Sequence, residues 1–196
     1  MKEILVVLLE GYADWEAASI AAVLNQQEKF TVKTVSNMKE PVHSMGGFTT
    51  LLDYTIAEAR EKDFAALLLI GGTSWRSSMA DEVKVLVKTA EQKGTVIAAI
   101  CDATVYVGTL GLLNDVKHTS NQLLDLKAYA GKNYTGEHNY QEVQAVRDKN
   151  IITANGTAHL EFAREVLLAL QAMPEAEIEQ WYDFYKLSYY EAVKKV

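Results

Sequence analysis

Long runs of apolar residues without polar alternation mark the central strands of this chain. Residues 4–9, 64–70 and 95–99 form such runs. Strands of this kind are buried on both faces of a parallel sheet, whereas a strand with one solvent-facing side alternates. Shorter patterns predict further strands at residues 30–35, 117–120, 143–146 and 151–154, and a small antiparallel hairpin over residues 42–52 around Gly46-Gly47.

Helical periodicity separates these strands. In the clearest case apolar residues recur at i, i+3, i+4 and i+7 from Val83, with Asp81 and Glu82 in the first turn and Lys93-Gly94 as stop signals. Helices are also expected over residues 15–25, from residues 100–104 to about 111, and where Ala163, Val166, Leu167 and Leu170 share one face. Strands that alternate with helices predict a single α/β domain with a doubly wound, mostly parallel sheet between two helical layers.

The C-terminal segment differs because aromatic residues are concentrated in it. Pro174 stands at the first turn of an expected helix, and Lys194 and Lys195 stand at its opposite end. Six of the 18 aromatic residues lie here, at Trp181, Tyr182, Phe184, Tyr185, Tyr189 and Tyr190. We expect one helix that extends a domain of residues 1–172. The segment 173–196 either packs on the domain surface or forms a dimer contact or a pocket wall.

Composition and charge restrict the partners. The chain has 196 residues, of which 49% are hydrophobic and 23% charged, as is usual for one globular domain. Its net charge is −7 and its basic residues form no cluster, which disfavours nucleic acid and anionic membranes as partners. The apolar runs are too short to span a membrane, and the first ends at Glu10 without a cleavage site, unlike a signal peptide. We therefore expect a cytoplasmic protein.

Cys101 is the single cysteine of the chain. An internal disulfide and a zinc site built from several thiolates are excluded, so any role of Cys101 is that of a free thiol. The pattern Ala99-Ile-Cys-Asp-Ala103 places it at a strand-to-helix junction with small residues two positions away on either side, as a sharply turned nucleophile requires. The N-terminus of the following helix favours the thiolate. The alternative is an inert core cysteine.

Two further features follow central strands and are expected at the same edge of the sheet, where open α/β folds bind ligands. Glu16 comes shortly after the first strand and supplies a carboxyl group. Gly71-Gly72 ends the strand at 64–70, where bare backbone N–H groups can face an oxyanion, with the Asp102 amide as second donor. The alternatives are a solvated helix residue for Glu16 and a plain turn for the glycines. With the thiol, these groups form a minimal site for addition to a carbonyl or acyl group.

These motifs, with Ile-Ile-Thr-Ala-Asn-Gly-Thr at residues 151–157 before a helix, resemble the ThiJ/PfpI family of the class I glutamine amidotransferase-like superfamily. The resemblance covers about residues 1–172 and implies a flavodoxin-like fold. It implies that Cys101 is a nucleophilic, oxidation-prone cysteine and that Glu16 hydrogen-bonds its sulfur, usually in protonated form. It also implies that Gly72 and Asp102 donate the oxyanion amides, and Gly71 is expected beside them in the substrate pocket.

Histidine partners that family members use are absent from their usual places. Asp102 directly follows the cysteine, where members with protease or amidase chemistry often carry histidine, and Asn121 stands where others have a histidine in a Thr-x-His pattern. Of the four histidines, which are His43, His118, His138 and His159, we expect His118 to point away from the site. His159 is the best candidate for a substitute base and, with Asn121, for the substrate pocket; a surface or structural role is its alternative.

Three functions compete at this point. The first is a cysteine-dependent enzyme of hydrolase, amidase, glyoxalase or deglycase type that acts on a small carbonyl or amide substrate. Without a base, attack on an amide is weak, whereas aldehydes stay accessible to a thiolate. The second is a redox-sensing or stress-response protein that uses oxidation of the same cysteine. The third and least favoured is a glutaminase, because no Cys-His-Glu triad is found. We expect a homodimer and neither a cofactor nor a metal.

Overall fold

The three continuous apolar runs form neighbouring strands at the centre of a seven-stranded sheet in the computed structural model, which describes residues 1–194. They are β1 (Lys2–Val7), β6 (Phe64–Leu69) and β7 (Val96–Ile100). The sheet order is β5-β2-β1-β6-β7-β9-β8, with β2 at Phe30–Ser36, β5 at Tyr54–Thr55, β8 at Ala145–Asp148 and β9 at Ile151–Ala154. Neighbouring strands are parallel except β8 against β9, so the predicted mostly parallel sheet is confirmed.

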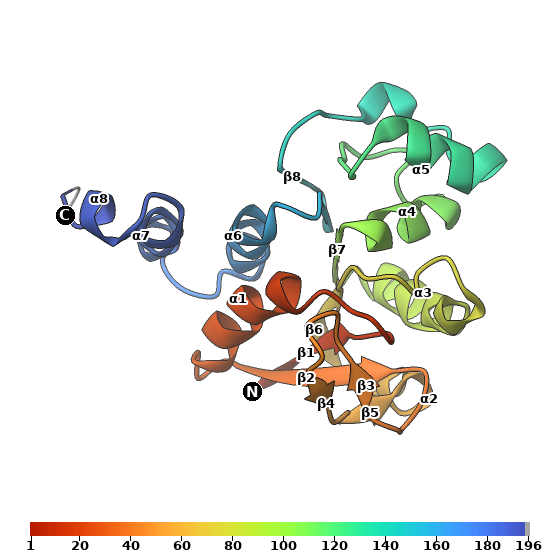
Figure 1. Cartoon of the computed structure of the whole chain (residues 1–196), viewed down its shortest axis with the longest axis horizontal. Coiled ribbons are helices and arrows are strands. Elements are labelled where there is room, and N and C mark those ends of the chain that lie inside the picture. The colour runs from red at the N-terminus through yellow and green to blue at the C-terminus, as the bar shows by residue number, and fades with distance from the viewer. Residues whose placement is uncertain (195–196) are drawn as a thin grey trace.

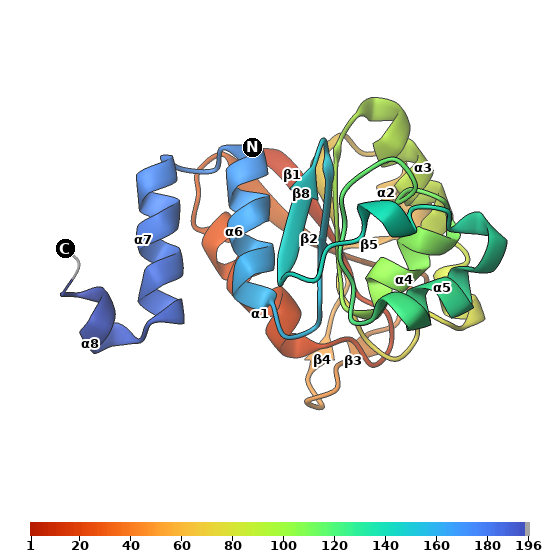
Figure 2. The same ribbon diagram turned by 90° about the horizontal axis from the view of Figure 1, so that it is seen from above.

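Alternate residues of the central strands enter two different cores, which explains why these strands carry no polar residue beyond Lys2 and Glu3 at the start of β1. Ile4 and Val6 pack into one core and Leu5 and Val7 into the other. The first core lies under α1 (Asp14–Asn25) and α6 (His159–Leu170). The second lies under α2 (Ile56–Ala59), α3 (Val83–Lys93), α4 (Asp102–Thr109) and α5 (Leu123–Ala130). Figures 1 and 2 show the sheet between these two helical layers, as the doubly wound prediction requires.

The order of the strands reverses between β1 and β6. From β1 the chain adds β2 on one side, and it then returns to add β6 and β7 on the other. The connections that leave β1 and β6 therefore go to opposite layers, which is the topological switch point at which open α/β sheets bind ligands. Glu16 follows β1, Gly71 follows β6 and Cys101 follows β7. The predicted site residues thus meet at one edge of the sheet.

Two local predictions are confirmed with shorter bounds. In α3 all four predicted apolar positions are buried, and the helix ends at Gly94 with φ +64°, a left-handed conformation that glycine adopts without strain. Asp81 and Glu82 precede this helix rather than lying in its first turn, after the 3₁₀ helix Ser78–Ala80. The predicted hairpin is present as β3 (Val42–His43) paired antiparallel with β4 (Thr49–Thr50).

One predicted strand is wrong and another is displaced. Residues 117–120 form no strand. Their β-type pairing consists of a single bridge from His118 to Tyr140. Instead, the Lys117 amide donates to the Asp148 carboxylate and the Thr119 amide to the Thr153 hydroxyl, so side chains take the place of a ladder. The strand expected at 143–146 is β8, which begins two residues later and ends at Asp148. The 3₁₀ helices Gly131–Asn133 and Glu137–Asn139 complete this region.

The C-terminal segment forms two helices, α7 (Glu175–Lys186) and α8 (Tyr189–Ala192), and the prediction of one helix is wrong. The break falls at Ser188, whose φ of +75° does not continue a right-handed helix. Helix α7 packs on α6 through the fully buried Ile178 and an ion pair from Arg164 to Glu179. Both helices project from the side of the domain that carries α6 (Figures 1 and 2). Lys195 lies outside the described residues.

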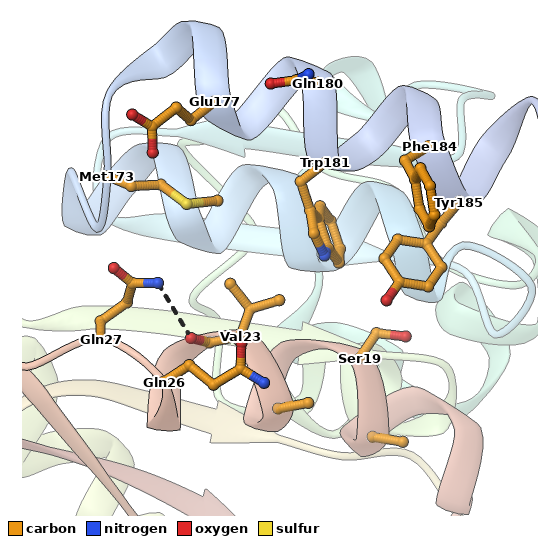
Figure 3. A pocket seen from close by; sticks show the side chains of 12 residues that line it. Ser19, Val23, Gln26, Gln27, Met173, Glu177, Gln180, Trp181, Phe184 and Tyr185 are labelled. Atoms are coloured by element: carbon orange, nitrogen blue, oxygen red, sulfur yellow. Dashed lines mark hydrogen bonds between the residues drawn. The ribbon is translucent and has the colours of Figure 1, made fainter. Parts of the chain in front are cut away.

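Helix α7 stands away from α1 and leaves a groove of about 840 Å³ between them. Figure 3 shows Trp181, Phe184 and Tyr185 reaching from α7 towards α1, where Ser19 and Val23 form the opposite wall. Three of the six C-terminal aromatic residues therefore line a groove, while α7 itself packs on the domain surface. Cys101 does not line this groove. Within residues 1–194 we find no helix that combines the length and the apolar character needed to cross a membrane.

Candidate active site

Cys101 is the turn between β7 and α4, and its backbone is strained. Its φ of 59° and ψ of −128° lie outside the regions that a non-glycine residue usually adopts. The turn is held by hydrogen bonds from the Cys101 amide to Ala154 O at 3.0 Å and from the Thr104 amide to Cys101 O at 3.0 Å. Ala99 and Ala103 on either side are fully buried, as the small-residue pattern predicts. Strained backbone of this kind is typical of functional sites.

Glu16, in the first turn of α1, is fully buried beside this turn. Its Oε2 atom accepts a hydrogen bond of 2.8 Å from the Gly71 amide. Its Oε1 atom is buried and has no partner of hydrogen-bond geometry among residues 1–194. Burial raises the pKa of this carboxyl to about 7, although the Gly71 amide and the Cys101 side chain act in the opposite direction. The carboxyl therefore exchanges its proton near neutral pH.

Two glycines make room for the thiol and the carboxyl to meet. A β-carbon at Gly71 would lie 2.4 Å from Glu16 Oε2 and 2.5 Å from Cys101 Cβ. A β-carbon at Gly156 would lie 2.9 Å from Cys101 Sγ and 3.3 Å from Glu16 Oε1. Any larger residue at either position would displace one of the two groups. The same distances place Cys101 and Glu16 in one small space, as their predicted partnership requires.

The Asn121 side chain also contacts the Cys101 sulfur. Its Nδ2 atom lies 3.3 Å from Cys101 Sγ, and its Oδ1 atom accepts a 2.8 Å hydrogen bond from the Gly156 amide. Because the amide of Gly156 can only donate, this bond fixes which end of the Asn121 carboxamide faces the thiol. Asn121 therefore presents an N–H donor to the sulfur, at the position where the family resemblance led us to look for a histidine.

The net effect of these surroundings is a thiol pKa above its ordinary value. Burial is the largest cause, and the Glu16 carboxyl adds to it. The Asn121 side chain and the Asp102 amide at the start of α4 lower the pKa, but by less. The helix N-terminus thus favours the thiolate, as the sequence indicates, yet burial outweighs it.

The backbone amides of Gly72 and Asp102, which the sequence suggests as oxyanion donors, both lie at this edge of the sheet. The Asp102 N–H faces the sulfur. Gly72 forms a bridge with Tyr12, and its own N–H has no hydrogen-bond acceptor in the described part of the chain. The neighbouring Gly71 is buried and its N–H is used by Glu16, so it holds the carboxyl rather than facing a pocket. The Asp102 carboxylate turns to Arg76 and not to the thiol.

Within residues 1–194 no histidine forms a hydrogen bond with the thiol. His159 Nδ1 lies 3.4 Å from Ser19 Oγ, so the geometry gives no support to its use as a substitute base. His118 is fully buried, bonded to Val116 O at 2.8 Å and to the Tyr134 hydroxyl at 2.7 Å, and points away from the site. His43 pairs with Glu10. No group of three or more His, Cys, Asp or Glu side chains in the described chain is arranged to hold a metal ion.

Sequence reasoning missed Arg76 and the role of Gly156. Arg76 follows β6 in a loop without periodicity, and nothing local indicates its two carboxylate partners. Gly156 belongs to the Ala-Asn-Gly-Thr motif that precedes α6, but only the fold brings it against Cys101. Trp15 also reaches this loop, through a 3.3 Å hydrogen bond from its indole N–H to Gly156 O.

A cysteine on a strained strand-to-helix turn beside a buried carboxyl, at the carboxyl edge of a parallel sheet, places the chain among the α/β proteins that carry a sharp strand-to-helix elbow there. Within this class the chain belongs to the DJ-1/PfpI family, whose model matches residues 2–169. The resemblance seen in the sequence motifs is therefore confirmed.

Named relatives and solved structures agree with this assignment. An uncharacterized protease of Bacillus subtilis, YdeA, is 46% identical over 169 residues, which cover 85% of this chain and 82% of the relative. A second uncharacterized protease of that organism, YoaZ, is 34% identical over 192 residues, or 94% and 91% of the two chains. The structure of a thiJ/pfpI family protein from Bacillus anthracis is similar with a TM-score of 0.89 and 32% identity, covering 98% of this chain and 93% of that one.

Proposed function

We propose that this protein is a cysteine-dependent enzyme that adds the Cys101 thiolate to the carbonyl carbon of a small aldehyde-type substrate. The observation that carries the proposal is the pairing of the half-buried thiol with the fully buried Glu16 carboxyl, whose pKa is about 7. A base is most effective when its pKa lies near the working pH, because it is then available and still drives proton transfer. Asn121, which contacts the sulfur, also lines a groove of about 670 Å³ that offers room for a substrate.

The addition step moves one proton and forms one carbon–sulfur bond. Ionised Glu16 takes the thiol proton onto Oε1, the atom that has no other partner. The sulfur then forms a bond to the carbonyl carbon while the C=O double bond opens, and the resulting oxyanion lies near the Gly72 and Asp102 amides. Glu16 returns the proton to that oxygen and leaves a neutral hemithioacetal. No further group is consumed, so the step is reversible and needs no cofactor.

Amide cleavage is a poorer match to this site. A leaving amine needs a proton donor, which related chemistry takes from an imidazole, and no described histidine contacts the thiol. General acid assistance is worth about two to four orders of magnitude. We therefore propose small aldehydes as the substrate class, and we do not assign to this chain the protease activity in the names of its relatives.

Methylglyoxal is the first substrate to test. Its consumption is expected to be lost in Cys101→Ala and retained in His43→Ala, since His43 pairs with Glu10 outside the site. Consumption that survives Cys101→Ala at the wild-type rate would refute the proposal. A panel of small amides, measured in the same way, is expected to be turned over far more slowly.

A second candidate is a redox sensor based on the same cysteine. Three donors surround the sulfur: Asn121 Nδ2, the Asp102 amide and the protonated form of Glu16. Two peroxide molecules, each reduced to water, would convert the thiolate to a sulfinate whose oxygens these donors can bind. Mass spectrometry of the Cys101 peptide after treatment with mild peroxide tests this function. The absence of two added oxygens would exclude it.

We also propose a cytoplasmic homodimer. Its support is the set of large apolar side chains that the described chain leaves exposed, among them Phe48 and Leu51 after β3 and Tyr189 and Tyr190 in α8. Sedimentation at low micromolar concentration tests the assembly, and a monomer there would contradict it.

A further inference from the structure

Arg76 joins two helices at the mouth of the site. Its Nε atom donates to both oxygens of Asp102, at 3.0 and 2.9 Å, and its Nη1 and Nη2 atoms donate to Asp125, at 3.0 and 2.6 Å. Asp102 is the first residue of α4, directly after the nucleophile, and Asp125 lies in the first turn of α5. The planar guanidinium therefore uses two edges to bind two carboxylates, a geometry that lysine cannot reproduce.

Helix α5 holds Arg76 by a second pair of contacts. The guanidinium lies over the ring of Tyr129, 4.9 Å from its centroid, and the Tyr129 hydroxyl donates to the main-chain oxygen of Arg76 at 3.3 Å. Asp125 and Tyr129 are one helical turn apart on the same face of α5. Both the side chain and the main chain of Arg76 are thus bound to this helix.

These contacts bear on the thiol through Asn121. Asn121 stands directly before Gln122, the N-cap of α5, so the position of the first turn of α5 sets where the Asn121 carboxamide lies. Arg76 ties that turn to Asp102, whose amide also faces the sulfur. The arrangement further explains why Asp102 takes no part in proton transfer, since its carboxylate is bound by Arg76.

We propose that Arg76 is a positioning residue: it locks the start of α5 onto the cysteine turn and so keeps the Asn121 N–H and the Asp102 amide on the sulfur. The proposal rests on the role of Cys101 in the proposed function, although its test needs only the reactivity of the thiol. We expect the fold to form without this contact, because the fully buried Leu126 packs α5 onto α4 at Gly108.

The test is a double-mutant cycle on the rate of Cys101 alkylation by iodoacetamide at pH 7. Among the described side chains, Glu16 is the titratable group in contact with the thiol, and it is unchanged in every variant. Asn121→Ala removes a hydrogen bond to the thiolate and is expected to slow alkylation roughly tenfold. Arg76→Gln, Arg76→Lys and Asp125→Ala are each expected to slow it by about three- to tenfold. Arg60→Gln, which removes an exposed arginine paired with Glu61, is the matched control and is expected to match wild type.

The decisive readout is the effect of Asn121→Ala in the Arg76→Gln background. We expect it to shrink to less than threefold, because the carboxamide is already out of place, whereas a merely structural role of Arg76 would leave the two effects additive. Additive effects, or an Arg76→Gln rate equal to that of Arg60→Gln, would overturn the proposal. The Asp125→Ala variant keeps it testable if Arg76→Gln does not fold. Loss of the Asn121 effect together with no aldehyde turnover in wild type would support the role of Arg76 while refuting the proposed enzyme.

Discussion

The unpartnered carboxyl oxygen of Glu16 and the thiol of Cys101 lie in one small space. The segments that carry them follow two different strands of the sheet, β1 and β7. The Gly71 amide holds the first group and the strained turn after β7 holds the second. Burial raises the pKa of both groups, and the Glu16 carboxyl raises the pKa of the thiol further. Near neutral pH the carboxyl therefore exchanges its proton, whereas the thiol, whose pKa is raised above its ordinary value, loses its proton only when Glu16 accepts it.

Burial of Glu16 makes the stability of the fold depend on pH. The pKa of Glu16 in the fold is about 7, above the ordinary value of 4.5, so the folded state binds its proton more tightly than the unfolded state. The stabilisation of the folded state by this bound proton is complete below pH 4.5 and is lost as the pH rises through about 7. Between these limits the free energy of unfolding is expected to fall by on the order of 3 kcal/mol relative to Glu16→Gln, as measured by urea unfolding at several pH values.

The control for this prediction is Glu28→Gln, a change at an exposed glutamate just after α1. Its pH profile is expected to follow wild type. Parallel profiles for wild type and Glu16→Gln would mean that the carboxyl is not buried in the folded state.

The architecture was predictable because it depends on local patterns. A strand buried on both faces needs apolar residues on both of them. The strands β1, β6 and β7 can therefore be recognised in the sequence by their continuous apolar runs. The cysteine turn was predictable because its small neighbours lie two residues away. Residues 117–120 carry no such apolar run, and their amides bond to Asp148 and Thr153, which are distant in sequence, so no local pattern shows that they form no strand.

The remaining features of the site depend on burial and on distant pairs, which no local pattern encodes. The helix N-terminus at Asp102 is visible in the sequence, whereas the desolvation that outweighs it is a property of the fold. Arg76 has no sequence signal because its partners Asp102 and Asp125 lie on two other elements. The break at Ser188 was missed because the aromatic residues around it suit a helix on both sides.

The strain at Cys101 predicts a difference in stability between two variants that lack the thiol. Glycine adopts a φ of 59° at little cost, whereas alanine keeps a β-carbon and with it the strain. Cys101→Gly is therefore expected to be more stable than Cys101→Ala by about 1 kcal/mol in denaturant unfolding. The exposed Lys149, at φ 55°, offers the matched pair Lys149→Gly and Lys149→Ala, for which the same sign is expected. Equal stability of the two cysteine variants would show that the turn is unstrained.

Gly156 is expected to be intolerant of a side chain because of the thiol. Its missing β-carbon would lie 2.9 Å from Cys101 Sγ, so Gly156→Ala must displace the sulfur or the loop that carries the Asn121 contact. We expect alkylation of Cys101 to slow by at least about tenfold, by analogy with the loss of well-oriented reacting groups. Thr157→Ala, at the exposed next residue, is the control. An alkylation rate for Gly156→Ala equal to that of Thr157→Ala would place the thiol elsewhere.

His118 and His159 are predicted to separate an effect on stability from an effect on chemistry. His118→Ala removes a buried ring bonded to Val116 O and to the Tyr134 hydroxyl and leaves that hydroxyl unpaired, so the free energy of unfolding should fall by about 2–4 kcal/mol. His159→Ala removes only a 3.4 Å contact with Ser19 and should keep methylglyoxal consumption within about twofold of wild type. A loss of activity in His159→Ala at unchanged stability would make His159 the base and remove Glu16 from that role.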